Sequence, residues 1–244
     1  MIQYQLTFQT PLPVSAGYNL YAFLLQQLPP KSAADIHDAS DFPISQWVQG
    51  TQWVITSFRP EVSAALDPIL AELRHVRLNG YPNLFVKHHR RREINAAQLL
   101  ETPSAGSIYL TFRTPTAFKS HGVYQLLPTQ ELVMQSLLRR WNLNFPDLAI
   151  EDEGGGLQAL TEGLVYRNVQ LQTASYQLKN TSIPGVCGCV ETELRLNGFH
   201  RQLACALLHF AGFAGLGIKT SLGMGGTAVH WTEEMPWNPK VEGA

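Results

Sequence analysis

Residues 212–226 read GFAGLGIKTSLGMGG, a segment with six glycines in which Lys219, Thr220 and Ser221 stand between the glycine pairs. Because glycine lacks a Cβ, it allows positive φ angles and a close approach of a partner to the backbone. Amides in such turns point together and bind anions, and Lys219 adds a mobile positive charge. The segment therefore predicts a loop that holds a phosphate.

The segment does not fit the nucleotide-binding loops that are rich in glycine. Residues 223–228 match G-x-G-x-x-A, but the dinucleotide fingerprint needs a strand before it and a helix after it. Here helical spacing over 199–210 comes before the segment, and a predicted strand over 225–231 follows. The chain also lacks the Gly-Lys-Ser or Gly-Lys-Thr of a Walker A loop. The alternative is a connector between a helix and a strand, a common use of glycine.

Outward from this segment, hydrophobic periodicity predicts the same order of elements twice. The first half reads as a strand over 2–8, helices over 18–28 and 32–37, a strand over 52–58, a helix from Pro60 interrupted at Pro68, and a strand over 73–78. The second half reads as a strand over 107–113, a helix over 129–141, strands over 164–178 and 186–196 joined around Pro184-Gly185, a helix after Asn197, and the strand over 225–231. Both are interpreted as ferredoxin-like units of β-α-β-β-α-β order, with three of the four strands recognised in the first half. The expected fold is α+β, with two tandem ferredoxin-like domains at 1–100 and 101–244.

Composition limits the kinds of partner. The 244 residues carry a formal net charge of −1, so a polyanion must bind at local basic clusters. Three cysteines and an N-terminus without signal-peptide features indicate a reducing, cytoplasmic location. No segment approaches the ~20 apolar residues of a membrane span. No set of His, Cys, Asp and Glu has metal-ligand spacing, so we expect no metal or other cofactor.

Four segments together resemble the CRISPR repeat-processing endoribonucleases of the RAMP superfamily. They are Gly215-x-Gly217 with Gly223-x-Gly225, residues 112–118 (FRTPTAF) with Gly122, residues 183–188 (IPGVCG), and Ile36-His37-Asp38 with residues 42–45 (FPIS). The resemblance implies two RAMP/RRM-like domains. It also implies cofactor-free, metal-independent cleavage of CRISPR repeat transcripts (pre-crRNA) into guide RNAs. Repeat RNA is the expected partner, with a homodimer and other CRISPR effector subunits as further candidates.

Such cleavage uses the 2′-hydroxyl beside the scissile phosphate and leaves 2′,3′-cyclic phosphate and 5′-hydroxyl ends. The family match makes His37 the candidate general base, since histidine titrates near neutrality; the alternative is an ordinary exposed histidine. Some family members add a tyrosine on the first helix and a lysine soon after the histidine. Residues 41–43 (DFP) supply no cation, so Tyr21 and Lys219 are the candidates for the acid and the phosphate clamp.

Local basic clusters mark the expected RNA surface. Residues 87–92 (KHHRRR) are the densest run, and each phosphate neutralised gives salt-dependent affinity; the alternative is a solvated loop or an interdomain strand. Phe42, Trp47 and Trp53 are candidates for base stacking or for core packing. The predicted RNA contacts are Gly215, Gly217, Lys219, Thr220, Ser221, Gly223, Gly225, Lys87, Arg90, Arg91, Arg92, Arg113, Lys119 and Arg139.

Two other functions fit the same elements. A non-catalytic RAMP subunit would bind guide RNA inside a CRISPR effector complex without cutting it. A ferredoxin-like protein for small molecules would use the glycine segment to hold a nucleotide phosphate and would not bind RNA. His37 in its family context favours the endoribonuclease.

Overall fold

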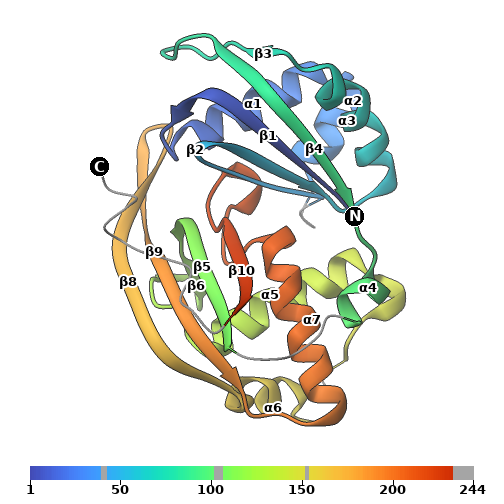
Figure 1. The fold of residues 1–244 in the computed structure, drawn as a ribbon, viewed down its shortest axis with the longest axis vertical. Helices are drawn as coiled ribbons and strands as arrows, with labels where there is room; N and C mark the ends of the chain where they lie inside the picture. Colours follow the sequence, from blue (N-terminus) through green and yellow to red (C-terminus); the bar gives the residue numbers. More distant parts are fainter. Residues whose placement is uncertain (40–42, 102–106, 152–153, 233–244) are drawn as a thin grey trace.

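The computed structural model describes residues 1–39, 43–101, 107–151 and 154–232. Its N-terminal half forms a sheet in the order β2-β1-β4-β3, with helices covering one face (Figure 1). The elements of this half are β1 Ile2–Leu12, α1 Ala16–Gln27, α2 Pro30–His37, β2 Ile44–Ser57, α3 Pro60–Glu72, β3 His75–Val76 and β4 Leu84–Glu93. α3 continues through Pro68, where the sequence predicted an interruption.

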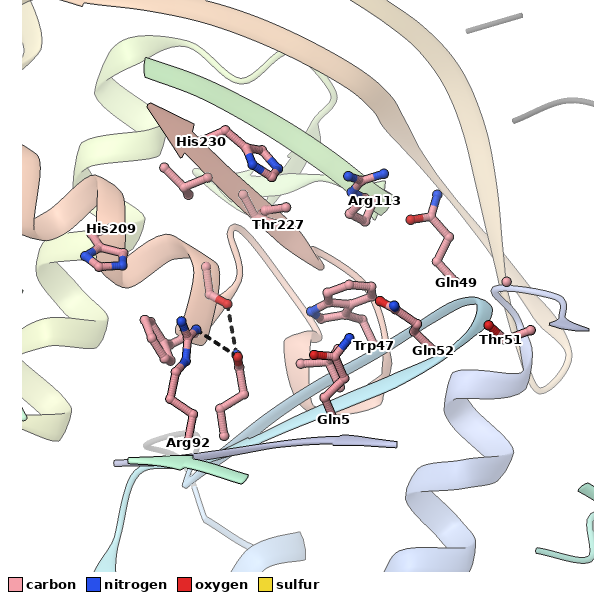
Figure 2. Close-up of a pocket in the computed structure, with 17 residues that line it drawn as sticks. Gln5, Trp47, Gln49, Thr51, Gln52, Arg92, Arg113, His209, Thr227 and His230 are labelled. Atoms are coloured by element: carbon pink, nitrogen blue, oxygen red, sulfur yellow. Dashed lines mark hydrogen bonds between the residues drawn. The ribbon is translucent and has the colours of Figure 1, made fainter. Parts of the chain in front are cut away.

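β1 and β2 give this sheet its ferredoxin-like order. The alternating side chains of Tyr4, Leu6 and Phe8 are buried against the apolar faces of α1 and α3. β2 bends back on itself at Gly50, whose φ is 56° (Figure 2). The amide of Phe58 accordingly donates to the Pro43 carbonyl at 3.0 Å. The second arm of β2 pairs with β1, so the two arms fill two strand positions of the β-α-β-β-α-β unit.

The last strand of this half is β4, and the prediction of a closing strand over 73–78 is wrong. Only His75–Val76 is extended there, as a short edge strand beside β4. β4 instead contains the basic run and pairs with β1 along its length. Nearly all of its side chains are exposed, so it lacks the buried alternation by which strands are recognised.

The C-terminal half forms a second sheet in the order β10-β5-β9-β8, covered by α5 and α7. Its elements are β5 Ser107–Thr116, β6 Phe118–Ser120, β7 Val123–Gln125, α5 Gln130–Asn144, η1 Pro146–Leu148, α6 Gly156–Gly163, β8 Leu164–Leu178, β9 Thr181–Leu194, α7 Gly198–Ala214, η2 Thr220–Leu222 and β10 Thr227–Thr232. The β8–β9 turn lies at Lys179-Asn180, because Leu178 pairs with Thr181. The predicted turn at Pro184-Gly185 is therefore wrong, since both residues lie inside β9.

Both halves have the element order and strand order of a ferredoxin-like domain, which confirms the predicted fold class. The remaining helix, α4 Ala96–Leu100, follows β4 but packs on the second half. Its Leu99 joins the core around α7, and Gln202 Nε2 donates to the Leu100 carbonyl at 3.0 Å. The domain boundary near residue 100 stays a prediction. No helix of the described residues is long and apolar enough to cross a membrane.

Candidate functional site

The glycine segment is a tightly packed connector between α7 and β10. Most of its amides already donate to acceptors within the protein: Leu216 to Gly225 O, Gly217 to Ser136 Oγ, Ile218 to Ala117 O and Gly225 to Pro115 O. The glycines from Gly215 onward are required by this packing, because a Cβ at each would overlap other protein atoms. Gly217 has a φ of 76°, and a Cβ there would overlap the Ala117 carbonyl.

A buried guanidinium group also holds this connector in place by hydrogen bonds. Arg140 of α5 is 3% exposed. It donates to the Ala214 carbonyl at 3.3 Å and to the Gly217 carbonyl at 2.9 Å. Burial, with a smaller contribution from Arg139, lowers the pKa of Arg140 to about 10, so it is a cation at neutral pH. The side chain therefore joins the end of α7 to the start of the glycine segment.

These contacts correct the prediction of an open phosphate cradle. Thr220 is 1% exposed, so its hydroxyl cannot meet a backbone phosphate. The glycines Gly215, Gly217, Gly223 and Gly225 shape a packed loop, because each has protein atoms where a Cβ would stand. Of the predicted RNA contacts in this segment, the half-buried Gly217, Lys219 and Ser221 still line surface pockets.

His37 lies in a pocket of about 450 Å³ that both domains line. α1 contributes Tyr18 and Tyr21, and α2 ends at His37. The opposite side comes from Lys179 of the β8–β9 turn and from Ser221 and Leu222 of η2. In Figure 1 the long β8–β9 hairpin runs from α6 up to the N-terminal domain, which explains how its turn reaches this pocket. Asp41 and Phe42 lie outside the described residues.

The His37 ring is oriented by its neighbour. Its Nδ1 lies 2.8 Å from Asp38 Oδ1, and both side chains are largely exposed. With the Nδ1 proton donated to this carboxylate, Nε2 is the nitrogen that accepts a proton. His37 is also in the last turn of α2, where the helix dipole favours a positive charge. The geometry suits a general base that becomes an imidazolium during the reaction.

Tyr21 is part of this pocket but is mostly buried, with 6% of its surface exposed. Burial is the main cause that raises its pKa above the ordinary value of 10, with smaller contributions from Tyr18 and Asp38. The phenol therefore stays protonated at neutral pH. It can donate a hydrogen bond, whereas it is a poor proton donor for rapid transfer.

Lys179 is a residue of this pocket that sequence reasoning missed. Among the described residues that line the pocket, it is the one lysine or arginine. Its φ of 50° belongs to the two-residue turn, and its Nζ lies 5.7 Å from the centre of the Tyr18 ring. The misplaced hairpin turn hid this position, because a Lys-Asn pair lacks the Asn-Gly or Gly-X signature by which two-residue turns are recognised.

Lys219 lies in a different pocket from His37. It shares a groove of about 560 Å³ with Lys119 of β6 and Arg139 of α5, under the β6–β7 hairpin. Three predicted RNA contacts far apart in the sequence therefore meet on one surface. The proposed role of Lys219 as a clamp beside His37 loses support, because Lys179 lines the His37 pocket instead.

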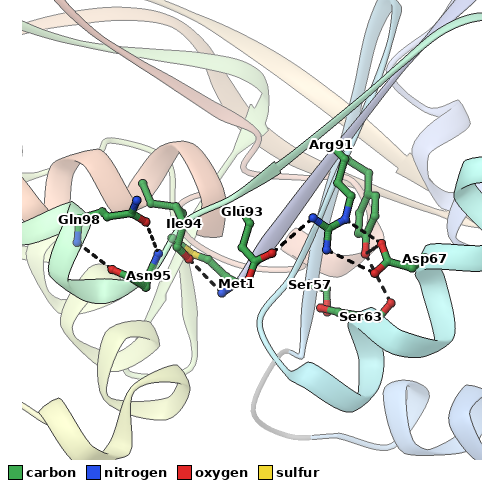
Figure 3. A network of polar contacts seen from close by, with 10 residues as sticks. Met1, Ser57, Ser63, Asp67, Arg91, Glu93, Ile94, Asn95 and Gln98 are labelled. Carbon is green, nitrogen blue, oxygen red and sulfur yellow. Dashed lines mark hydrogen bonds and ion pairs between the residues drawn. The ribbon is translucent and has the colours of Figure 1, made fainter.

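The basic strand β4 divides its charges between two faces of the sheet. Arg91 stands opposite Tyr4 and points to the helices, since paired residues share a face. It pairs with Asp67 of α3 at 3.0 Å and with Glu93 at 3.3 Å, while Tyr4 also donates to Asp67 (Figure 3). Asp67 and Glu93 hold the Arg91 guanidinium on the helix side, away from Arg90 and Arg92. The contact of Arg91 with RNA stays a prediction that this arrangement does not support.

Arg90 and Arg92 lie on the other face of β4, toward the C-terminal domain. Arg92 donates to Gln3 Oε1 at 3.0 Å and lies 4.4 Å from the centre of the Phe213 ring. With Trp47 of β2 it lines an interdomain cleft of about 780 Å³, to which Arg113 contributes from the C-terminal domain (Figure 2). Two predicted cationic contacts, Arg92 and Arg113, thus meet in the cleft. Trp53 is completely buried and belongs to the core.

His209, which lines this cleft, makes the stability of the folded protein dependent on pH. Burial, and secondly the Arg92 charge, lower the pKa of His209 below the ordinary value of 6.5. The unfolded chain therefore takes up a proton before the folded protein does, and stability is lost as the pH falls below about 6.5. We expect His209→Gln to reduce the fall in thermal midpoint between pH 7 and pH 5. His200→Gln, at an exposed position of α7, controls for the substitution; an unchanged fall in the His209 variant would contradict the prediction.

Comparison with known proteins identifies the family. The family model of the CRISPR-associated endoribonuclease Cas6 matches residues 110–227. A CRISPR-associated endoribonuclease Cas6 of Streptococcus thermophilus is 30% identical over 217 residues, which cover 84% of this chain and 88% of that protein. The chain belongs to the Cas6 family. A Cas6 of Mycobacterium tuberculosis (strain CDC 1551 / Oshkosh) is 25% identical over 228 residues, or 87% of this chain and 71% of that protein.

Solved Cas6 structures share the fold of nearly all of the chain. A Cas6 product complex (TTHA0078) superposes with a TM-score of 0.76 at 24% identity and covers 94% of this chain and 100% of its own. A second Cas6 product complex (TTHB231) gives a TM-score of 0.75 at 20% identity, covering 94% and 98%. Membership of the Cas6 family makes the chain a CRISPR repeat-processing endoribonuclease, which confirms the expectation drawn from the four sequence segments.

Proposed function

We propose that the His37 pocket cuts the repeat transcript without a metal, by attack of the 2′-hydroxyl beside the scissile phosphate. The 2′ oxygen bonds to phosphorus as the bond from phosphorus to the 5′ oxygen breaks. His37 Nε2 takes the proton of the 2′-hydroxyl, the leaving 5′ oxygen takes a proton from water, and the imidazolium then returns its proton to solvent. The products are a 2′,3′-cyclic phosphate and a 5′-hydroxyl end.

The observation that carries this proposal is the position of His37, oriented by Asp38, in a pocket that both domains line. Lys179 brings a cation to the same pocket, suited to the charge that develops on the phosphate. Tyr21 remains protonated and can donate a hydrogen bond to a phosphate oxygen. Together these groups supply a base, a cation and a donor without a metal.

The basic groove and the interdomain cleft, together with the His37 pocket, are the proposed path of the RNA. Lys119, Arg139 and Lys219 line the groove, and Ser221 links it to the His37 pocket two residues along the chain. Arg92 and Arg113 line the cleft. Lys87 and Arg90 lie exposed on β4 as further phosphate contacts. Product and substrate-mimic complexes of related Cas6 proteins support an RNA ligand.

The deciding experiment incubates the protein with a synthetic repeat RNA in excess EDTA. We expect cleavage in EDTA, a 5′-hydroxyl product that polynucleotide kinase can label, and a 3′ end that resists phosphatase until the cyclic phosphate is opened. A repeat with one 2′-deoxy nucleotide at the cut site should remain intact. Cleavage that stops in EDTA and returns with Mg²⁺ would overturn the mechanism, and binding without any cleavage would indicate an RNA-binding subunit instead.

The two faces of β4 provide a matched test of the RNA path. Arg90→Gln should weaken repeat binding and reduce the slope of log affinity against log salt by about 1, the loss expected for one phosphate contact. Arg91→Gln removes the same charge from the opposite face, so it should leave the slope unchanged while lowering stability. Equal slopes in both variants would contradict the division of charges.

A homodimer and attachment to other effector subunits stay predictions, which light scattering with and without RNA can check.

A further inference from the structure

The side chains of three consecutive residues of β2, in the N-terminal domain, contact the C-terminal domain. The Ser45 hydroxyl donates to the Phe213 carbonyl at the end of α7. The side chain of Trp47 lies against Gly226, where it occupies the space that a Cβ would need. Between them, Gln46 reaches the glycine segment. The first arm of β2 therefore forms much of the contact between the two domains.

Both polar atoms of the Gln46 side-chain amide form hydrogen bonds in this contact. It is 1% exposed, and its Nε2 donates to the Gly17 carbonyl at 2.9 Å and to the Ser221 carbonyl at 3.1 Å. Its Oε1 accepts from Trp53 Nε1 at 3.0 Å. Because an indole nitrogen only donates and a carbonyl only accepts, these partners allow a single orientation of the amide.

The two carbonyls that Gln46 joins belong to α1 and η2, the elements that supply opposite walls of the His37 pocket. Gly17 is the second residue of α1, next to Tyr18, while Ser221 lies in η2. The walls are in close contact, since a Cβ on Gly17 would lie 3.2 Å from Gly223 Cα and 2.8 Å from the Tyr176 hydroxyl. Tyr176 in turn donates to the Leu222 carbonyl at 2.6 Å. The separation of the walls thus depends on a few hydrogen bonds in a packed interior.

We propose that Gln46 is a positioning residue for RNA cleavage, one that holds α1 and η2 at the separation needed for His37 and Lys179 to face the same phosphate. This inference rests on the proposed function of the His37 pocket. His37 belongs to the N-terminal domain and Lys179 to the C-terminal domain, so their alignment depends on the domain contact. A displacement of about 1 Å between reacting groups costs on the order of 100-fold in rate.

The test compares Gln46→Leu with Ser45→Ala. Each variant removes buried hydrogen bonds between the domains, but only Gln46 bonds to the walls of the pocket. We expect Gln46→Leu to lower the single-turnover rate of repeat cleavage on the order of 100-fold, with little change in repeat affinity. Ser45→Ala should lower the thermal midpoint and leave the rate nearly unchanged. Rate losses that follow the thermal midpoints of the two variants would show a structural role only.

Gln46→Glu keeps the shape of the side chain and adds a pH-dependent readout. An ionised carboxylate cannot donate to the two carbonyls, whereas a protonated carboxyl regains one donor, and burial beside carbonyls raises the pKa of such a group. The rate of this variant relative to the unmodified protein should therefore rise as the pH falls, and a constant ratio would overturn the proposal. Cleavage by His37→Ala would reject the proposed site itself. An inactive His37→Ala with fully active Gln46 variants would reject only the positioning role.

Discussion

Replacement of His37 by alanine should leave a folded protein that binds repeat RNA and hardly cuts it. The loss of a positioned general base costs on the order of 100- to 10,000-fold in rate. The side chain is largely exposed at the end of α2, so its removal should change the thermal midpoint little. Single-turnover cleavage and equilibrium binding, measured on the same preparation, separate the two effects.

Two further variants sharpen this result. Asp38→Asn should reduce the rate less than His37→Ala, because the ring remains while the carboxylate that orients Nδ1 is lost. His75→Ala removes an exposed histidine that packs on Phe85 at the edge of the first sheet, so it should cut RNA normally. If His37→Ala cut the repeat at the normal rate, the base would have to be sought elsewhere in the chain.

Gly217→Val should cause a large loss of stability. The left-handed φ of 76° is strained for a β-branched residue, and its side chain would overlap the Ala117 carbonyl. Strain and overpacking each cost about 1–3 kcal/mol. A loss of about 3 kcal/mol lowers the thermal midpoint by roughly 10 °C in a chain of this size. Differential scanning calorimetry measures the shift directly.

This expectation replaces the interpretation that the sequence alone suggests. As part of an open phosphate loop, Gly217 would matter for RNA binding more than for stability. Its amide donates to Ser136 Oγ and its carbonyl accepts from Arg140, so the residue belongs to the packed interior of the loop. Gly212→Ala is the matched control, because a Cβ there meets only Val229 at 3.9 Å. A normal midpoint for Gly217→Val would restore the open-loop interpretation.

The core strands were predictable because their side chains alternate between a buried and an exposed face. β1 shows this pattern, and the apolar stripes of α5 and α7 indicate which faces they bury. β4 was not predictable in this way. Its pairing with β1 is made by the backbone, while its side chains face solvent, the cleft or Asp67. Local periodicity is informative only where an element buries apolar side chains.

The candidate site also contains one residue that the sequence predicted and one that it did not. Its histidine was found from a short motif, because the residues around His37 are contiguous in the chain. Lys179 is more than 140 positions away and reaches the pocket only through the length of the β8–β9 hairpin, whose turn was misplaced by a few residues. The cation of the site therefore follows from the register of two long strands.

The order of residues along the chain was enough to predict two ferredoxin-like units, a glycine-rich loop before the last strand and a histidine at the end of a short helix. These features depend on local patterns of residues. Three-dimensional packing was needed to establish that the glycines are packed, that Arg90 and Arg91 lie on opposite faces of one strand, and that His37 and Lys179 share a pocket. Each of these depends on which distant segments the two domains bring into contact, because a side chain's partners are set by strand register and domain packing.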